Sequence, residues 1–80
     1  MQIEISKKAA KAIARMDAVV KNRIWQGLNY IPKGDIVPLK GASGSYRLRI
    51  GHWRILFSYP APHVILVEDI APRGQIYKGV

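Results

Sequence analysis

The stretch from Tyr46 to Phe57 reads YRLRIGHWRILF, and its pattern decides the fold of the chain. Apolar residues occupy alternate positions on both sides of Gly51-His52. Such alternation around a Gly-led pair predicts two antiparallel strands joined by a two-residue hairpin turn of type II′. A hairpin with one apolar face cannot stand alone in water, so the rest of the chain must supply a cover for that face.

The turn length also sets which side chains share a face, because directly opposed residues point the same way. One face carries the apolar side chains of Tyr46, Leu48, Ile50, Trp53, Ile55 and Phe57. The other face carries Arg47, Arg49 and Arg54, with Arg49 directly opposite Arg54. Like charges so placed destabilise a sheet by about 0.2 to 1 kcal/mol, so we expect something anionic at this face. The alternative is that the arginines are only the solvated side of a half-covered sheet.

Length and composition indicate one small domain, over residues 1–80, with a strong basic bias. The chain has 80 residues, a net charge of +8 and a pI near 10.2. This charge favours polyanionic partners, with nucleic acid first and an acidic protein or a membrane surface as the alternatives. The absence of cysteine excludes disulfides and thiolate metal sites. Neither a leader pattern nor an apolar run of about 18 residues occurs, so we expect a cytoplasmic protein.

The segment before the hairpin predicts an α+β fold. The expected elements are a strand over 1–5, a helix over 7–16 capped by Ser6, and a helix over 18–31 capped by Asp17 and ended by Pro32 and Gly34. Two helices with a short connection form an antiparallel helical hairpin. We expect its apolar stripe to cover the apolar face of the sheet.

The segments on either side of the central hairpin predict loops and one further strand. Residues 33–45 are expected to be a loop, because glycine and proline interrupt any periodicity. The second hairpin strand is expected to end at Ser58 or Tyr59, before a turn over 60–62. The apolar run 64–70 predicts a central strand. Residues 71–78 are expected to form a loop or a last short strand.

In this order and spacing, the elements and motifs resemble the RelE-type toxins of bacterial and archaeal toxin-antitoxin pairs, which are small ribosome-dependent mRNA endoribonucleases. The resemblance runs from Met1 to Lys78. It is carried by Leu39-Lys40-Gly41, by the stretch 46–51 leading into 53–57, and by Arg73 with Tyr77 ahead of Lys78. It implies an N-terminal strand and an antiparallel helical hairpin packed on one face of a small, mainly antiparallel sheet. The open concave face of that sheet would hold RNA.

The resemblance also implies a site and a reaction. The implied catalytic residues are Arg47, Arg49, Arg54, Arg73 and Tyr77, and the implied RNA contacts are Lys40, His52 and Lys78. In the reaction a ribose 2′-hydroxyl attacks the adjacent phosphate, giving a cyclic phosphate and a free 5′-hydroxyl. Fixed guanidinium groups stabilise the charge that develops on the phosphate oxygens. No metal or cofactor is implied, and two histidines with five acidic residues offer no convincing metal cage.

The general base is left open by the sequence. Relatives often have lysine where this chain has Arg47 and Arg49, and a guanidinium that stays protonated is not a credible base. His52 carries the side-chain type that titrates nearest neutral pH, but it lies in the predicted turn, where histidines are mostly solvated. Tyr77 could orient the 2′-hydroxyl, transfer a proton or stack on a base, or it could only pack the C-terminal segment.

Three functions follow from these expectations. The first is an mRNA interferase that acts on the ribosome and is silenced by an acidic, partly disordered antitoxin, with no membrane partner. The second is a ParE-like inhibitor of DNA gyrase with the same fold. The third is a basic nucleic-acid-binding domain without activity. ParE-type proteins generally lack the catalytic set, so the basic cluster favours cleavage.

Overall fold

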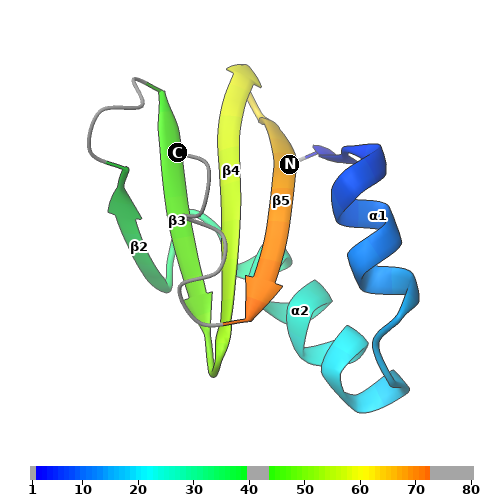
Figure 1. Ribbon diagram of the computed structural model, residues 1–80. Helices are drawn as coiled ribbons and strands as arrows, with labels where there is room; N and C mark the ends of the chain where they lie inside the picture. The colour runs from blue at the N-terminus through cyan, green and yellow to red at the C-terminus, as the bar shows by residue number, and fades with distance from the viewer. Residues whose placement is uncertain (1, 40–43, 73–80) are drawn as a thin grey trace.

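A computed structural model describes residues 2–39 and 44–72 of the chain (Figure 1). The elements are β1 (Gln2–Ile5), α1 (Lys7–Ala14), α2 (Ala18–Tyr30), β2 (Asp35–Pro38), β3 (Ser45–Ile50), β4 (Trp53–Ala61) and β5 (Val64–Pro72). The strands form one sheet in the order β1-β5-β4-β3-β2, in which only the β1–β5 pair is parallel. The predicted α+β architecture, with an N-terminal strand, two helices and a mainly antiparallel sheet, is confirmed.

The β3–β4 hairpin has the predicted register. Ile50 is paired with Trp53, Arg49 with Arg54, and Tyr46 with Phe57. Gly51, the first residue of the turn, has a φ of 57°, the left-handed value that favours glycine at this position. Because the register follows from the turn, the apolar and basic residues are sorted onto opposite faces as the sequence predicts.

Both predicted helix caps are present. The Ser6 hydroxyl accepts a hydrogen bond from the Ala9 amide (3.1 Å), and the Asp17 carboxylate accepts one from the Val20 amide (2.9 Å). The first helix ends at Ala14 rather than residue 16, because the chain must return to extended backbone at Asp17. The second helix ends at Tyr30, one residue earlier than expected, since a residue before proline disfavours helical backbone.

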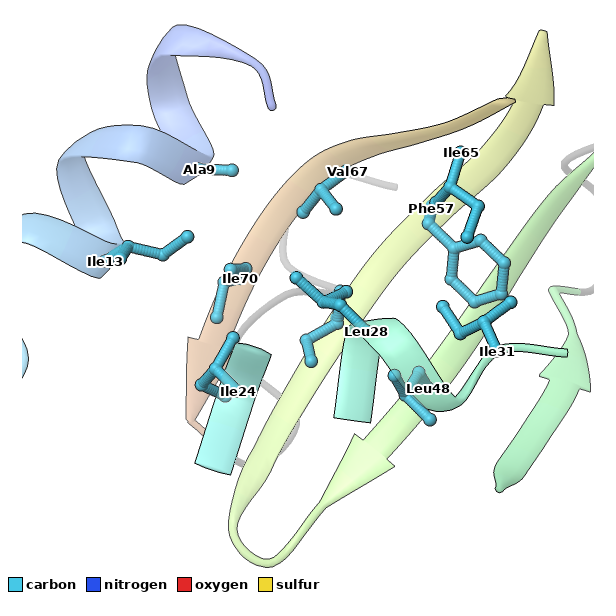
Figure 2. Close-up of a cluster of buried hydrophobic side chains, with 11 residues drawn as sticks. Ala9, Ile13, Ile24, Leu28, Ile31, Leu48, Phe57, Ile65, Val67 and Ile70 are labelled. Carbon is cyan, nitrogen blue, oxygen red and sulfur yellow. The ribbon is translucent and has the colours of Figure 1, made fainter. Parts of the chain in front are cut away.

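The helices cover one face of the sheet and leave the other face open. In Figure 1, α2 lies behind the sheet and α1 runs beside β5. The buried hydrophobic side chains, most of them shown in Figure 2, are Ala9, Ile13, Ile24, Leu28, Ile31, Leu48, Ile55, Phe57, Ile65, Val67 and Ile70. Tyr46, Ile50 and Trp53 are partly buried and pack against this cluster. The apolar face of the hairpin is therefore core, as predicted.

Two of the expected loop segments are wrong in part. Residues 35–38, expected within a loop, form the edge strand β2, which pairs with β3 from Asp35↔Arg49 to Pro38↔Tyr46. Pro38 is tolerated because an edge strand need not donate on its free side. The strand β4 continues through Pro60 to Ala61, where the ladder with β5 is irregular, and proline is accepted at such places.

The apolar run 64–70 is an interior strand, as expected, since β5 lies between β1 and β4. This strand also continues for two residues beyond the predicted end, to Pro72. In the part of the chain that the structure describes, no helix combines the length and the apolar character needed to cross a membrane.

Candidate functional site

The candidate site lies on the open face of the sheet, where strand pairing gathers three arginines. Arg49 of β3 is opposite Arg54 of β4 on one side and Asp35 of β2 on the other. Arg47 lies two residues before Arg49 and therefore points to the same face. Because Leu48 between them is buried in the core, the arginine side chains project away from the helices. We refer to Asp35, Arg47, Arg49 and Arg54 as the open-face cluster.

The anion expected beside the arginines is supplied in part by the chain itself. A carboxylate oxygen of Asp35 lies 3.5 Å from Nε of Arg49, and the other lies 3.9 Å from Nη2 of Arg47. One carboxylate thus faces two guanidinium groups and offsets part of the repulsion between Arg49 and Arg54. The cluster keeps an excess of two positive charges, because three arginines face one acid.

Arg47 is more buried than Arg49. Its side chain is 21% exposed, against 52% for the side chain of Arg49. Its Nε is buried and has no hydrogen-bond partner within the described residues. A buried donor without an acceptor is costly, so Asp35 is an incomplete partner for Arg47.

His52 lies exposed in the turn at the tip of the β3–β4 hairpin, as predicted from its position. Over residues 2–39 and 44–72, no hydrogen bond or ion pair joins His52 to the open-face cluster. The geometry therefore adds nothing to the case for His52 as the general base.

Four further site residues predicted from the sequence, Lys40, Arg73, Tyr77 and Lys78, lie outside the described residues. The structure thus brings together the three arginines of the central hairpin and leaves the other assignments as expectations. Over the described ranges, no group of three His, Asp or Glu side chains could hold a metal ion.

Asp35 is the member of the cluster that sequence reasoning missed. The sequence offers little indication of a strand here, because the segment from Asp35 to Pro38 is short, follows Gly34 and ends in a proline. Aspartate is also uncommon in strands. The pairing of β2 with β3 is what places Asp35 opposite Arg49.

A group of aromatic side chains lies on the helix side of the sheet and is separate from the open-face cluster. Tyr59 contacts the rings of Tyr46 and Phe57, each with a centroid separation of 5.5 Å. Burial, and secondarily the neighbouring Tyr46, raises the pKa of Tyr59 above its ordinary value of 10.0. The phenol therefore stays neutral at physiological pH and acts as a packing group.

No family model and no curated protein matches the chain. Solved structures do. A chain of the archaeal RelE-RelB complex from Pyrococcus horikoshii OT3 matches with a TM-score of 0.75 and 26% identity, covering 92% of this chain and 96% of that one. The RelB-RelE complex from Methanococcus jannaschii gives a TM-score of 0.77 at 22% identity, over 95% and 96% of the two chains. The isolated RelE toxin of E. coli gives 0.72 at 15% identity, over 98% and 92%.

The matches cover nearly the whole length of both chains, so the likeness concerns the complete fold and not one motif. At 22% and 15% identity the second and third show the fold alone, and the first adds a modest similarity in sequence. The resemblance inferred from the residues is thereby confirmed: this chain is similar, in fold and in the order of its elements, to the RelE toxins of toxin-antitoxin pairs.

Proposed function

We propose that the chain is the toxin of a type II toxin-antitoxin pair and that it cleaves mRNA on the ribosome in the cytoplasm. The observation that carries the proposal is the position of Arg47, Arg49 and Arg54 on the open face of a RelE-like sheet. This face offers fixed guanidinium donors to a phosphate. The structural relatives crystallised with RelB support an antitoxin as the protein partner.

The reaction is an intramolecular displacement at phosphorus. The ribose 2′-oxygen forms a bond to the adjacent phosphorus, and the bond to the 5′-oxygen of the next nucleotide breaks. The products are a 2′,3′-cyclic phosphate and a 5′-hydroxyl, with the proton of the 2′-hydroxyl passing to a base and a proton reaching the leaving oxygen. Guanidinium groups aimed at the nonbridging oxygens stabilise the charge that develops on them.

Within this proposal, the three arginines differ in role according to how they are held. Arg47, which is more buried than Arg49, is suited to fix the position of the phosphate. Arg49 is more exposed and can adjust to the substrate. Arg54 lies next to Arg49 on the interior strand β4 and completes a row of donors across the sheet.

The proposal is tested by the variant Arg54→Ala in a translation reaction. Loss of one donor to a developing oxyanion typically costs about a hundredfold to a thousandfold in rate, so we expect cleavage to fall by that amount. The wild-type products should carry a free 5′-hydroxyl, detected by direct phosphorylation with a polynucleotide kinase. Growth arrest in cells should be lost together with cleavage.

The matched control is Arg23→Ala, which removes the same charge from an exposed position of α2. Its guanidinium lies beside Gly51 of the turn and, within the described residues, forms no ion pair with the open-face cluster. This control should cleave like the wild type. Loss of melting cooperativity in Arg54→Ala would instead show a structural role for that residue. If the wild-type protein left translated message intact but inhibited supercoiling by gyrase, the ParE-like function would replace the proposed one.

A further inference from the structure

The row Asp35–Arg49–Arg54 raises the question of what an acid does inside a phosphate-binding face. Asp35 is on the edge strand β2, where solvent is available and no core contact calls for a charged residue. Aspartate is among the residues depleted in strands, so the strand itself gives no reason for it. Within the described residues, the polar contacts of its side chain are the two ion pairs with Arg47 and Arg49.

These ion pairs have the character of a replaceable contact. Their N···O separations of 3.5 and 3.9 Å exceed the 2.7–2.9 Å that is typical of a charge-assisted hydrogen bond. Half of the Asp35 side chain, 52%, is exposed to solvent. Ion pairs at these separations with a half-exposed carboxylate contribute little to folding stability, so the fold does not depend on them.

The guanidinium nitrogens that face Asp35 are also those that a phosphate on this face would contact. Carboxylate and phosphate oxygens are equivalent partners for the arginine fork, and the same N–H groups cannot serve both at full strength. Binding a phosphate beside Arg47 and Arg49 therefore brings a second negative charge next to Asp35. The phosphate has to displace the carboxylate or bear its repulsion.

We propose that Asp35 is an internal competitor for the RNA phosphate, a positioning residue that occupies Arg47 and Arg49 in the free protein and releases them when RNA binds. The inference rests on the proposed function, because it takes RNA as the ligand of the open face. Asp35 keeps the two guanidinium groups side by side against their mutual repulsion. It also weakens the hold of the site on any RNA that is not positioned well enough to replace it.

The test compares Asp35→Asn with Glu4→Gln in binding a short 2′-O-methyl RNA oligonucleotide, which lacks the 2′-hydroxyl nucleophile. Glu4 is an exposed acid on β1, at the opposite edge of the sheet, so both variants change the net charge equally. Fluorescence anisotropy at low salt should give a Kd about twofold to fivefold lower for Asp35→Asn than for wild type, as expected from removing one exposed ion-pair competitor. Glu4→Gln should stay close to wild type.

Two additions make the result specific to the arginines and independent of one substitution. Asp35→Thr, which suits a strand, should show the same gain in affinity as Asp35→Asn. In an Arg49→Gln background the gain from Asp35→Asn should shrink, because half of the internal ion pairing is already gone. A merely structural Asp35 would lower the affinity when replaced, whereas a competitor raises it.

The inference is overturned if Asp35→Asn binds the oligonucleotide no better than Glu4→Gln, or if its gain is unchanged without Arg49. Its failure can be separated from failure of the proposed function. If the wild type cleaves translated message but Asp35→Asn shows no gain in RNA affinity, the competitor role of Asp35 is wrong and the proposed ribonuclease activity stands. If Asp35→Asn shows a gain in RNA affinity but the wild type leaves translated message intact, the competitor role stands and the proposed ribonuclease activity is wrong.

Discussion

Arg47 and Arg49 lie two positions apart on the same strand and face, yet their surroundings differ. Arg47 is 21% exposed, and its buried Nε lacks an acceptor within the described residues. Arg49 is 52% exposed and is flanked by Asp35 on one side and Arg54 on the other. Arg47 therefore differs from Arg49 in burial, and Arg49 differs from Arg47 in lying between an opposite and a like charge. Under the proposed function, a phosphate at this face would meet one largely buried donor and one more exposed donor.

On the covered side of the sheet, Tyr59 is the residue whose ionisation is most clearly altered. Its ring contacts Tyr46 and Phe57 at the end of β4. Desolvation by burial and then the proximity of Tyr46 disfavour the phenolate, which raises the pKa of Tyr59 above 10.0. A raised value means that the folded state binds the proton more tightly than the unfolded state. The resulting stability is fully present below pH 10 and is lost as pH rises through the folded-state pKa.

We expect an alkaline titration followed by tyrosinate absorbance to show this shift. The step that disappears in Tyr59→Phe should lie above pH 10.0, the ordinary value for the side chain. In Tyr46→Phe the pKa of Tyr59 should move toward that value without reaching it, because burial remains the larger cause. A step for Tyr59 at or below pH 10 in the wild type would contradict the packing described for this cluster.

Among the elements, the register of the β3–β4 hairpin was predictable and β2 was not, for one physical reason. In the hairpin, strict alternation and a two-residue turn together fix which residues face each other, so the arginine cluster follows from the sequence. The strand β2 is only four residues long and gains its stability from pairing with β3, a contact that its own sequence does not encode. Asp35 was missed together with its strand.

Gly27 of α2 lies close against the side chain of Ile50 in β3. A Cβ placed there would overlap Cδ1 of Ile50 and lie 3.0 Å from its Cγ1. Glycine in a helix interior destabilises the helix by about 1 kcal/mol relative to alanine. Its presence here is explained by the close packing of α2 against β3. The sequence shows this glycine within an apolar helix stripe but not the side chain that requires it.

We predict that Gly27→Ala lowers the free energy of unfolding by about 1 kcal/mol, because overpacking costs about 1 to 3 kcal/mol and the helix preference returns about 1 kcal/mol. In an Ile50→Val background, which lacks Cδ1, the same substitution should be close to neutral or stabilising. Urea denaturation of the four proteins measures the coupling between the two positions. An equal loss in both backgrounds would show that the side chain of Ile50 is not what limits the approach of α2.

At the scale of the whole molecule, the chain divides its chemistry between the two faces of one sheet. The face covered by helices holds the core (Figure 2). The strand pairing places the arginines on the other face of the sheet. The net charge of +8 was plain from composition, and so was the expectation of an anionic partner. The order of the strands, with β1 pairing in parallel to the distant β5, depends on long-range packing and is seen only in the fold.

A small core beside an excess of positive charge makes the molecule responsive to an acidic partner. We expect the proposed antitoxin to raise the Tm, because a ligand that binds only the folded state adds about 2.7 kcal/mol of stability at a hundredfold excess over its Kd. Carboxylates laid on the open face would compete there with RNA, as Asp35 is proposed to do from within. Thermal unfolding with and without the partner measures the rise in Tm. Repeating it at two salt concentrations shows how much of that rise is electrostatic.

Truncated partners separate binding from inhibition. If acidic residues of the antitoxin occupy the open-face cluster while an apolar helix supplies most of the affinity, removing the acidic segment should restore cleavage and leave the complex intact. Removing the helix should abolish the complex and the gain in Tm together. In the Arg47→Gln protein, the salt-dependent part of the rise in Tm caused by the partner should be smaller. In the Arg23→Ala protein it should be unchanged, because Arg47 belongs to the open-face cluster and Arg23 does not. A complete complex that cleaves translated message as fast as the free protein would place the partner away from the open face.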